Sequence, residues 1–74
     1  MSETSGMSDP VYKTVEITGT STVDVSTAVQ NAVEKAAQSL RNIDWFEVKG
    51  IRGSIADGAI QQFQATVKIG FRLD

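Results

Sequence analysis

The chain lacks the residue types that most enzymes use for nucleophilic or general-base chemistry. Its 74 residues include no cysteine and no histidine, which excludes thiolate nucleophiles, imidazole bases and the usual zinc ligands. Asp44 and Glu47 are two carboxylates close in sequence, but a pair of acids alone is a weak signal for catalysis. No segment resembles a calcium-binding loop. The sequence therefore predicts a protein that is not an enzyme and holds no metal.

The remaining candidates for chemistry suit the binding of a flat molecule. Trp45 follows the alternation of a strand whose next residue, Phe46, faces the core, so the indole is expected on the opposite face. An exposed indole either packs against another subunit or stacks on a planar ligand. The amide of Gln64 is expected on the same face, where it can both donate to and accept from the polar edge of a heterocycle.

Two arginines are candidates for holding an anion. Arg52 and Arg72 can each bind a phosphate through paired hydrogen bonds. The simpler interpretation, which the residues alone favour, is an ordinary solvated or inter-subunit ion pair. The carboxylates available for such pairs are Glu16, Glu47 and Asp44.

The first half of the chain predicts a strand followed by a helix. Residues 1–10 are mostly small and polar, which is typical of a disordered tail. Apolar and polar residues alternate over residues 11–18, which predicts a strand that ends at Gly19–Thr22. From Val25 to Leu40 apolar residues recur every three or four positions, which predicts an amphipathic helix. We expect Asp24 or Ser26 to cap its first turn and Asn42 to stop it.

The second half predicts a hairpin. Residues 45–55 form the first of its strands, and the apolar phase slips in a way that a β-bulge at Lys49–Gly50 would correct. Asp57–Gly58 supplies the turn, and residues 63–73 alternate as the last strand. The expected fold is α+β, in the order β-α-β-β, with a three-stranded antiparallel sheet packed on one helix. One helix covers one face only, which leaves the polar face open to subunits or a ligand.

The register of this hairpin places Trp45 and Gln64 far apart. Pairing across the turn puts Trp45 opposite about residue 70, so Gln64 lies about six residues away, roughly 20 Å along the strand. If the two side chains serve one ligand, the site must lie between subunits.

Length, charge and hydropathy limit the partners and the compartment that the chain is expected to have. A 74-residue domain without disulfides or metal is expected to gain stability from oligomerisation. The net charge of −2 argues against a nucleic-acid partner. No apolar run approaches the roughly 18 residues of a membrane span, and no signal peptide is visible, so we expect a cytoplasmic protein.

Over residues 11–74 the sequence resembles the dodecin family. The segments that carry the resemblance are Val11–Lys13, Val15–Ser21, Ala28–Val33, Leu40–Val48, Ile51–Gly53 and Gln64–Leu73. The resemblance implies a sheet wrapped around one helix, assembled as a hollow homododecamer that stacks flavins in pairs between tryptophans of neighbouring subunits. It also implies the roles of five residues: Trp45 stacks on the flavin, Gln64 binds its edge, Arg52 and Arg72 bind the FMN phosphate, and Asp44 lines the pocket.

The resemblance further implies a role in flavin storage, sequestration and photoprotection, with FMN, riboflavin or FAD as ligand. Some bacterial members also bind coenzyme A near the first strand and the helix end. The matching positions are Tyr12, Lys13, Lys35, Ser39 and Arg41. The alternatives are a structural or coenzyme A-binding oligomer without flavin specificity, and a flavin-dependent enzyme, for which no substrate pocket is visible.

Overall fold

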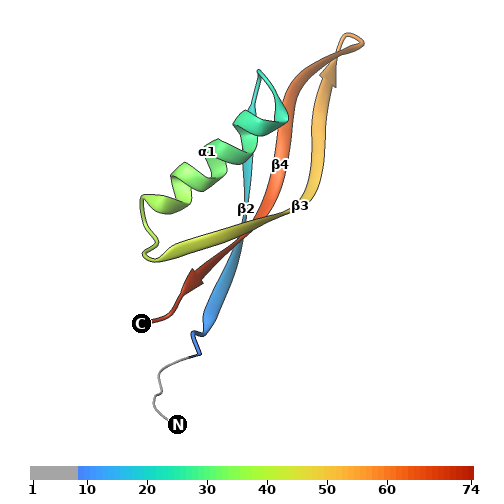
Figure 1. The fold of residues 1–74 in the computed structure, drawn as a ribbon. Coiled ribbons are helices and arrows are strands. Elements are labelled where there is room, and N and C mark those ends of the chain that lie inside the picture. The colour runs from blue at the N-terminus through green and yellow to red at the C-terminus, as the bar shows by residue number, and fades with distance from the viewer. Residues whose placement is uncertain (1–8) are drawn as a thin grey trace.

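The structure, a computed structural model, describes residues 9–74. The elements follow the order β2 (Tyr12–Ser21), α1 (Val25–Ala37), β3 (Ile43–Ala56) and β4 (Ala59–Arg72). Strand β4 is central in an antiparallel sheet of order β2-β4-β3, and α1 packs across one face (Figure 1). The predicted α+β fold and strand order are confirmed. Most of the expected tail lies outside the described residues.

The helix begins where the sequence predicts and ends earlier. Asp24 is its N-cap, because Oδ1 accepts a hydrogen bond from the Thr27 amide at 2.7 Å. This bond lowers the pKa of the Asp24 carboxyl. The helix ends at Ala37 rather than near Asn42, where the chain adopts a φ of 64°. In residues 9–74 no helix has both the length and the apolar character that a membrane crossing requires.

The strand break expected at Gly19 is wrong, since β2 continues through this residue to Ser21. A Cβ built on Gly19 would lie 2.1 Å from the Ala28 carbonyl oxygen and 2.9 Å from the Ala32 Cβ. Gly19 therefore lies where the helix backbone approaches the strand closely, and its missing side chain permits that packing rather than a turn.

The predicted bulge and turn are confirmed. Val48 is paired with Val67 and Gly50 with Thr66, which leaves Lys49 as the extra residue. Asp57 and Gly58 have φ values of 52° and 76°, the left-handed conformations that a tight hairpin turn requires. Both strands are longer than expected: β3 begins at Ile43 and ends at Ala56, and β4 begins at Ala59, next to the turn, and ends at Arg72.

Two further irregularities were not predicted. Asp44 is an extra residue between Ile43, paired with Phe71, and Trp45, paired with Gly70. A second shift between Ser54 and Ile55 makes Gln61 the extra residue of β4. Each shift reverses which face the following side chains occupy.

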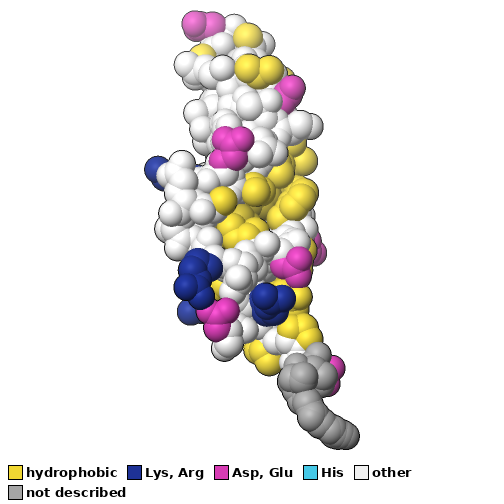
Figure 2. Space-filling view, turned by 60° about the vertical axis from the view of Figure 1, so that its left-hand side comes forward, with side chains coloured by type: hydrophobic (Ala, Val, Ile, Leu, Met, Phe, Trp, Pro, Cys, Tyr) yellow, Lys and Arg dark blue, Asp and Glu magenta, His cyan; other side chains and the backbone are white. Residues whose placement is uncertain are grey.

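We call the face of the sheet toward α1 the inner face and the opposite one the outer face. On the inner face, α1 covers β2 and β4, and the core is formed by Ala28, Ala32, Ala36, Ala65, Val67 and Ile69. The inner face of β3 is left uncovered: Phe46, Val48 and Ile51 are 52%, 41% and 60% exposed. Figure 2 shows hydrophobic side chains gathered in a band on the surface. One subunit thus completes only part of its core.

Candidate functional site

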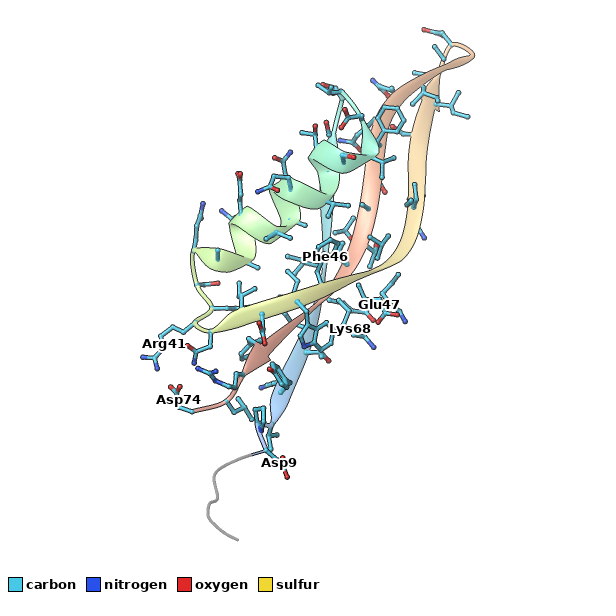
Figure 3. The ribbon with its side chains drawn as sticks, viewed as in Figure 1. Asp9, Arg41, Phe46, Glu47, Lys68 and Asp74 are labelled. Atoms are coloured by element: carbon cyan, nitrogen blue, oxygen red, sulfur yellow. The ribbon has the colours of Figure 1, made fainter. Side chains whose placement is uncertain are left out.

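The outer face carries the predicted site residues in rows across the sheet, because β4 pairs with a strand on each side. Directly opposite residues of an antiparallel pair share a face. In Figure 3, Glu47 and Lys68 lie together on the outer face, while Phe46 points to the inner face. The rows, from β2 to β3, are Thr14–Gly70–Trp45, Glu16–Lys68–Glu47, Thr18–Thr66–Gly50 and Thr20–Gln64–Arg52, with Tyr12 opposite Arg72 beyond the first.

Trp45 is seated on the backbone of β4. Because Asp44 is an extra residue, the Trp45 side chain lies on the outer face, where the indole occupies the space above Gly70. A Cβ at residue 70 would lie 2.2 Å from Trp45 Cε2 and 2.3 Å from Cζ2, so only glycine leaves room for the ring. The indole is 40% exposed. One side of the ring is therefore supported by the sheet, and the exposed part is available for stacking.

Tyr12 and Asp44 flank this indole. The Tyr12 and Trp45 ring centroids are 6.3 Å apart, with the planes inclined by 53°. The Tyr12 hydroxyl donates a hydrogen bond to Asp44 Oδ2 at 2.6 Å. This bond raises the pKa of Tyr12, because the carboxylate holds the phenol proton, while the Arg72 guanidinium acts in the opposite direction. We call Tyr12, Asp44, Trp45, Gly70 and Arg72 the tryptophan end of the outer face.

The other group of polar side chains lies further along β4. Gln64 is half-buried, and its Nε2 donates to Gln62 Oε1 at 3.0 Å, which leaves the Gln64 carbonyl oxygen able to accept. Arg52 and Thr20 lie directly opposite Gln64, one on each neighbouring strand. We call Thr20, Arg52, Gln62 and Gln64 the glutamine end. It offers hydrogen bonds and a cation but no aromatic ring.

The two arginines have no carboxylate partner within the described part of the chain. The salt bridge found within residues 9–74 joins Arg41 and Asp74. Within one chain, Arg52 and Arg72 make no salt bridge to Glu16, Glu47 or Asp44, so solvated side chains or pairs between subunits, as the sequence suggests, stay predictions. Both guanidinium groups are exposed. One lies at each end of the outer face.

The predicted register is confirmed, since Trp45 pairs with Gly70. Gly70 and Gln64 are six residues apart on β4, which is about 20 Å at the rise of an extended strand. Two charged and polar rows separate them. A single subunit therefore cannot present both ends of the outer face to one ring system.

The residues matched to coenzyme A binding divide between the two faces. Tyr12 lies on the outer face, whereas Lys13 lies on the inner face opposite Phe71. Lys35 is in the last turn of α1. Ser39 and Arg41 line a cavity of about 290 Å³ beside the C-terminal residues. The guanidinium group of Arg41 is already bound to Asp74, near the end of β4 (Figure 3).

Two features of this site escaped sequence reasoning. Gly70 is the residue on which the indole is seated. The clue in the sequence was a glycine opposite Trp45 in an otherwise regular polar run. The hydrogen bond between Tyr12 and Asp44 joins residues 32 positions apart. It depends on the registers of both strand pairs and on the extra residue at position 44.

Comparison with known proteins places this geometry in one family. The family model described as Dodecin matches residues 11–74. A dodecin of Thermus thermophilus is 45% identical over 64 residues, which cover 86% of this chain and 93% of that protein. The structure of dodecin from Streptomyces coelicolor superposes with a TM-score of 0.87 at 48% identity, covering 92% of this chain and 97% of that one. Dodecin from Streptomyces davaonensis gives 0.86 at 46% identity, covering 90% and 98%.

Proposed function

The chain belongs to the dodecin family, and on that premise we propose that it is a cytoplasmic protein that binds flavin without catalysing a reaction. The observation that carries the proposal is the seating of Trp45: an indole fixed on Gly70 and 40% exposed on the outer face. A large aromatic ring held open to solvent is costly unless a partner covers it. A planar ring system is the partner that its geometry fits.

We propose that the binding unit is a hollow homododecamer in which FMN or riboflavin stacks in pairs between tryptophans of neighbouring subunits. Two observations support an assembly. The inner face of β3 leaves Phe46, Val48 and Ile51 exposed, and a 74-residue chain buries only part of its apolar surface by itself. The tryptophan and glutamine ends also lie too far apart to meet one ligand within a subunit.

The side chains present fit a flavin phosphate. In this proposal Trp45 stacks on the ring, Gln64 of another subunit hydrogen-bonds its polar edge, and Asp44 lines the pocket. Arg52 and Arg72, which have no carboxylate partner among the described residues, bind the phosphate of FMN. A bound flavin would supply light absorption and redox reactivity. The contribution of the chain is to store it, to keep water and oxygen away and to hold an electron-rich indole against it.

The test is a fluorescence titration of FMN into the purified assembly, with Trp45→Ala and Trp45→Phe beside the wild type. Quenching should saturate near one flavin per subunit. Trp45→Ala should weaken FMN binding by about 5- to 150-fold, since aromatic stacking on a base is worth about 1–3 kcal/mol, and Trp45→Phe should weaken it less. Sedimentation analysis checks that each variant assembles. Absence of quenching by an assembled wild type would exclude the flavin proposal.

A second candidate is an oligomer that binds coenzyme A without flavin specificity. The cavity of about 290 Å³ lined by Ser39 and Arg41 favours it, but Arg41 is occupied by Asp74. An anionic ligand would have to displace that carboxylate. Calorimetric titration with coenzyme A should therefore show tighter binding to Asp74→Asn than to the wild type, and equal, negligible heats for both would exclude this candidate.

A further inference from the structure

The Tyr12–Asp44 pair has a geometry that stacking a ligand on Trp45 does not require. The chain contains one tyrosine and one tryptophan, and the fold brings both to the tryptophan end. Their ring centroids, 6.3 Å apart, lie within the range of aromatic pairs in contact. The Tyr12 hydroxyl points at a carboxylate, with Oη and Asp44 Oδ2 separated by 2.6 Å. The three side chains thus form a row of indole, phenol and carboxylate.

We propose that Tyr12 and Asp44 together return an electron to Trp45 after the indole has been oxidised. The oxidant is a one-electron acceptor against Trp45, such as a light-excited aromatic ligand or an external oxidant, and it keeps the electron that it takes. The indole radical cation then receives one electron from Tyr12, and the phenol proton moves to Asp44. Trp45 is restored, Tyr12 becomes a neutral phenoxyl radical and Asp44 becomes a carboxylic acid.

The distances suit both the electron transfer from Tyr12 to Trp45 and the proton transfer from Tyr12 to Asp44. Electron transfer becomes faster as two rings approach, and these rings are near contact. The proton has only to cross an existing hydrogen bond of 2.6 Å, a length typical of a bond to a charged acceptor. The acceptor is already in place, because Asp44 Oδ2 receives the Tyr12 hydrogen bond before any oxidation. Oxidation makes a phenol strongly acidic, which drives the proton toward the carboxylate.

The ground state favours the starting arrangement. The hydrogen bond to Asp44 raises the pKa of Tyr12, so the phenol keeps its proton until it is oxidised. Arg72, opposite Tyr12 in the register, is the other charge that acts on this phenol, and it lowers the same pKa. The transfer from Tyr12 therefore does not begin until Trp45 has been oxidised. This proposal rests on the proposed function only for the natural oxidant, a light-excited ligand stacked on Trp45.

A purely structural role for this hydrogen bond makes a different prediction. If Tyr12 only holds the bulge at Asp44, its removal shifts the indole but does not change the lifetime of an indole radical. If Tyr12 reduces Trp45, its removal prolongs that lifetime. With a single tyrosine and a single tryptophan in the chain, each radical signal has one source.

The experiment uses the assembled protein without flavin and a ruthenium(III) tris-bipyridine oxidant produced by a laser flash. Transient absorption follows the indole and phenoxyl radicals. In the wild type, the indole radical should decay at the first-order rate at which the phenoxyl radical appears. Tyr12→Phe should leave a long-lived indole radical. Asp44→Asn should slow the transfer by at least about 100-fold, the low end of what a positioned proton acceptor contributes, and Asp44→Glu should restore much of it.

Two results would overturn the proposal. One is an indole radical that decays equally fast in Tyr12→Phe and the wild type. The other is a phenoxyl radical that appears with consumption of the oxidant, and appears unchanged in Trp45→Phe, because Tyr12 would then be oxidised directly. Circular dichroism and sedimentation establish that the variants fold and assemble. Since no flavin is used, failure here leaves the FMN titration to decide the proposed function separately.

Discussion

The two ends of the outer face differ in how firmly they hold their side chains. At the tryptophan end, the indole is fixed from below by Gly70 and from the side by Tyr12, which is itself bound to Asp44. At the glutamine end, Gln64 has one hydrogen bond to a neighbouring amide, and the Arg52 guanidinium is exposed. One end is preorganised around an aromatic ring, whereas the other is adaptable and has no aromatic ring.

This difference separates two tasks of recognition. A stacking surface gains affinity from rigidity, because little conformational freedom is lost on binding. Amide and guanidinium groups on long side chains adjust to the polar atoms of different ligands, which gives orientation and selectivity. The sheet holds the two ends about 20 Å apart, so in the assembly we propose each subunit would contribute to two ligands rather than enclose one.

The largest effect is expected from mixing subunits that each lack one end. Trp45→Ala and Gln64→Ala homo-oligomers should both bind FMN poorly. When the two chains are unfolded, mixed equally and reassembled, about one site in four should combine an intact tryptophan end with an intact glutamine end from different subunits. The measurement is the fraction of FMN quenched at saturation. Mixtures that bind no better than the two parents would contradict a site shared between subunits.

Gly70→Ala should damage the tryptophan end while sparing the other. The added Cβ would lie 2.2 Å from the indole, so Trp45 must leave its seat, and FMN affinity should fall by about tenfold or more, which corresponds to about 1.4 kcal/mol. The matched control is Gly50→Ala, because a Cβ at Gly50 meets nothing within 4 Å. Equal losses in both variants would show that the effect is not specific to the indole seat.

The arginines should distinguish FMN from riboflavin. Arg52→Ala and Arg72→Ala should each weaken FMN binding by about tenfold or more, since a hydrogen bond to a charged group is worth about 1.5–3 kcal/mol. Both variants should leave riboflavin affinity nearly unchanged. Lys49→Ala, which removes an exposed cation from the bulge of β3, is the control. If one arginine has the effect and the other does not, the phosphate lies at that end alone.

The smallest expected effect is on the titration of Tyr12. Its pKa is raised above the ordinary value of 10.0 mainly by the hydrogen bond to Asp44, so Asp44→Asn should lower it. Because the folded-state pKa is raised, the stabilisation from this bond is present below pH 10 and is lost as the pH rises through the raised value. Phenolate absorbance measures the shift. Glu47→Gln, on the same strand but paired with Lys68, should leave the titration curve in place.

The helix, the hairpin and the register could be predicted because their signals are local. The bulge at Lys49 was visible as a change of phase between Val48 and Ile51. The extra residue at Asp44 was not, because Ile43 and Trp45 are both apolar and their spacing of two suggests one shared face. The structure places Ile43 opposite Phe71 on the inner face and Trp45 on the outer face.

Other features depend on packing that no single segment encodes. Gly19 has the sequence signature of a turn, yet it marks the contact with α1. The three-residue spacing of Ile60 and Phe63 did hold a signal for the extra residue Gln61, of the same kind as that at Lys49. The uncovered inner face of β3 could not be predicted, because it depends on where the helix axis crosses the sheet.

That uncovered face makes the subunit sensitive to dilution. Strand β3 lies at the edge of the sheet, with Phe46, Val48 and Ile51 open to water on one side and unpaired backbone groups along its margin. An unassembled chain exposes this long hydrophobic edge strand, the kind of surface that promotes aggregation. In the assembly we propose, the folded fraction would rise with the concentration of the chain. At low concentration the unassembled chain would then be a substrate for proteases and chaperones rather than a subunit.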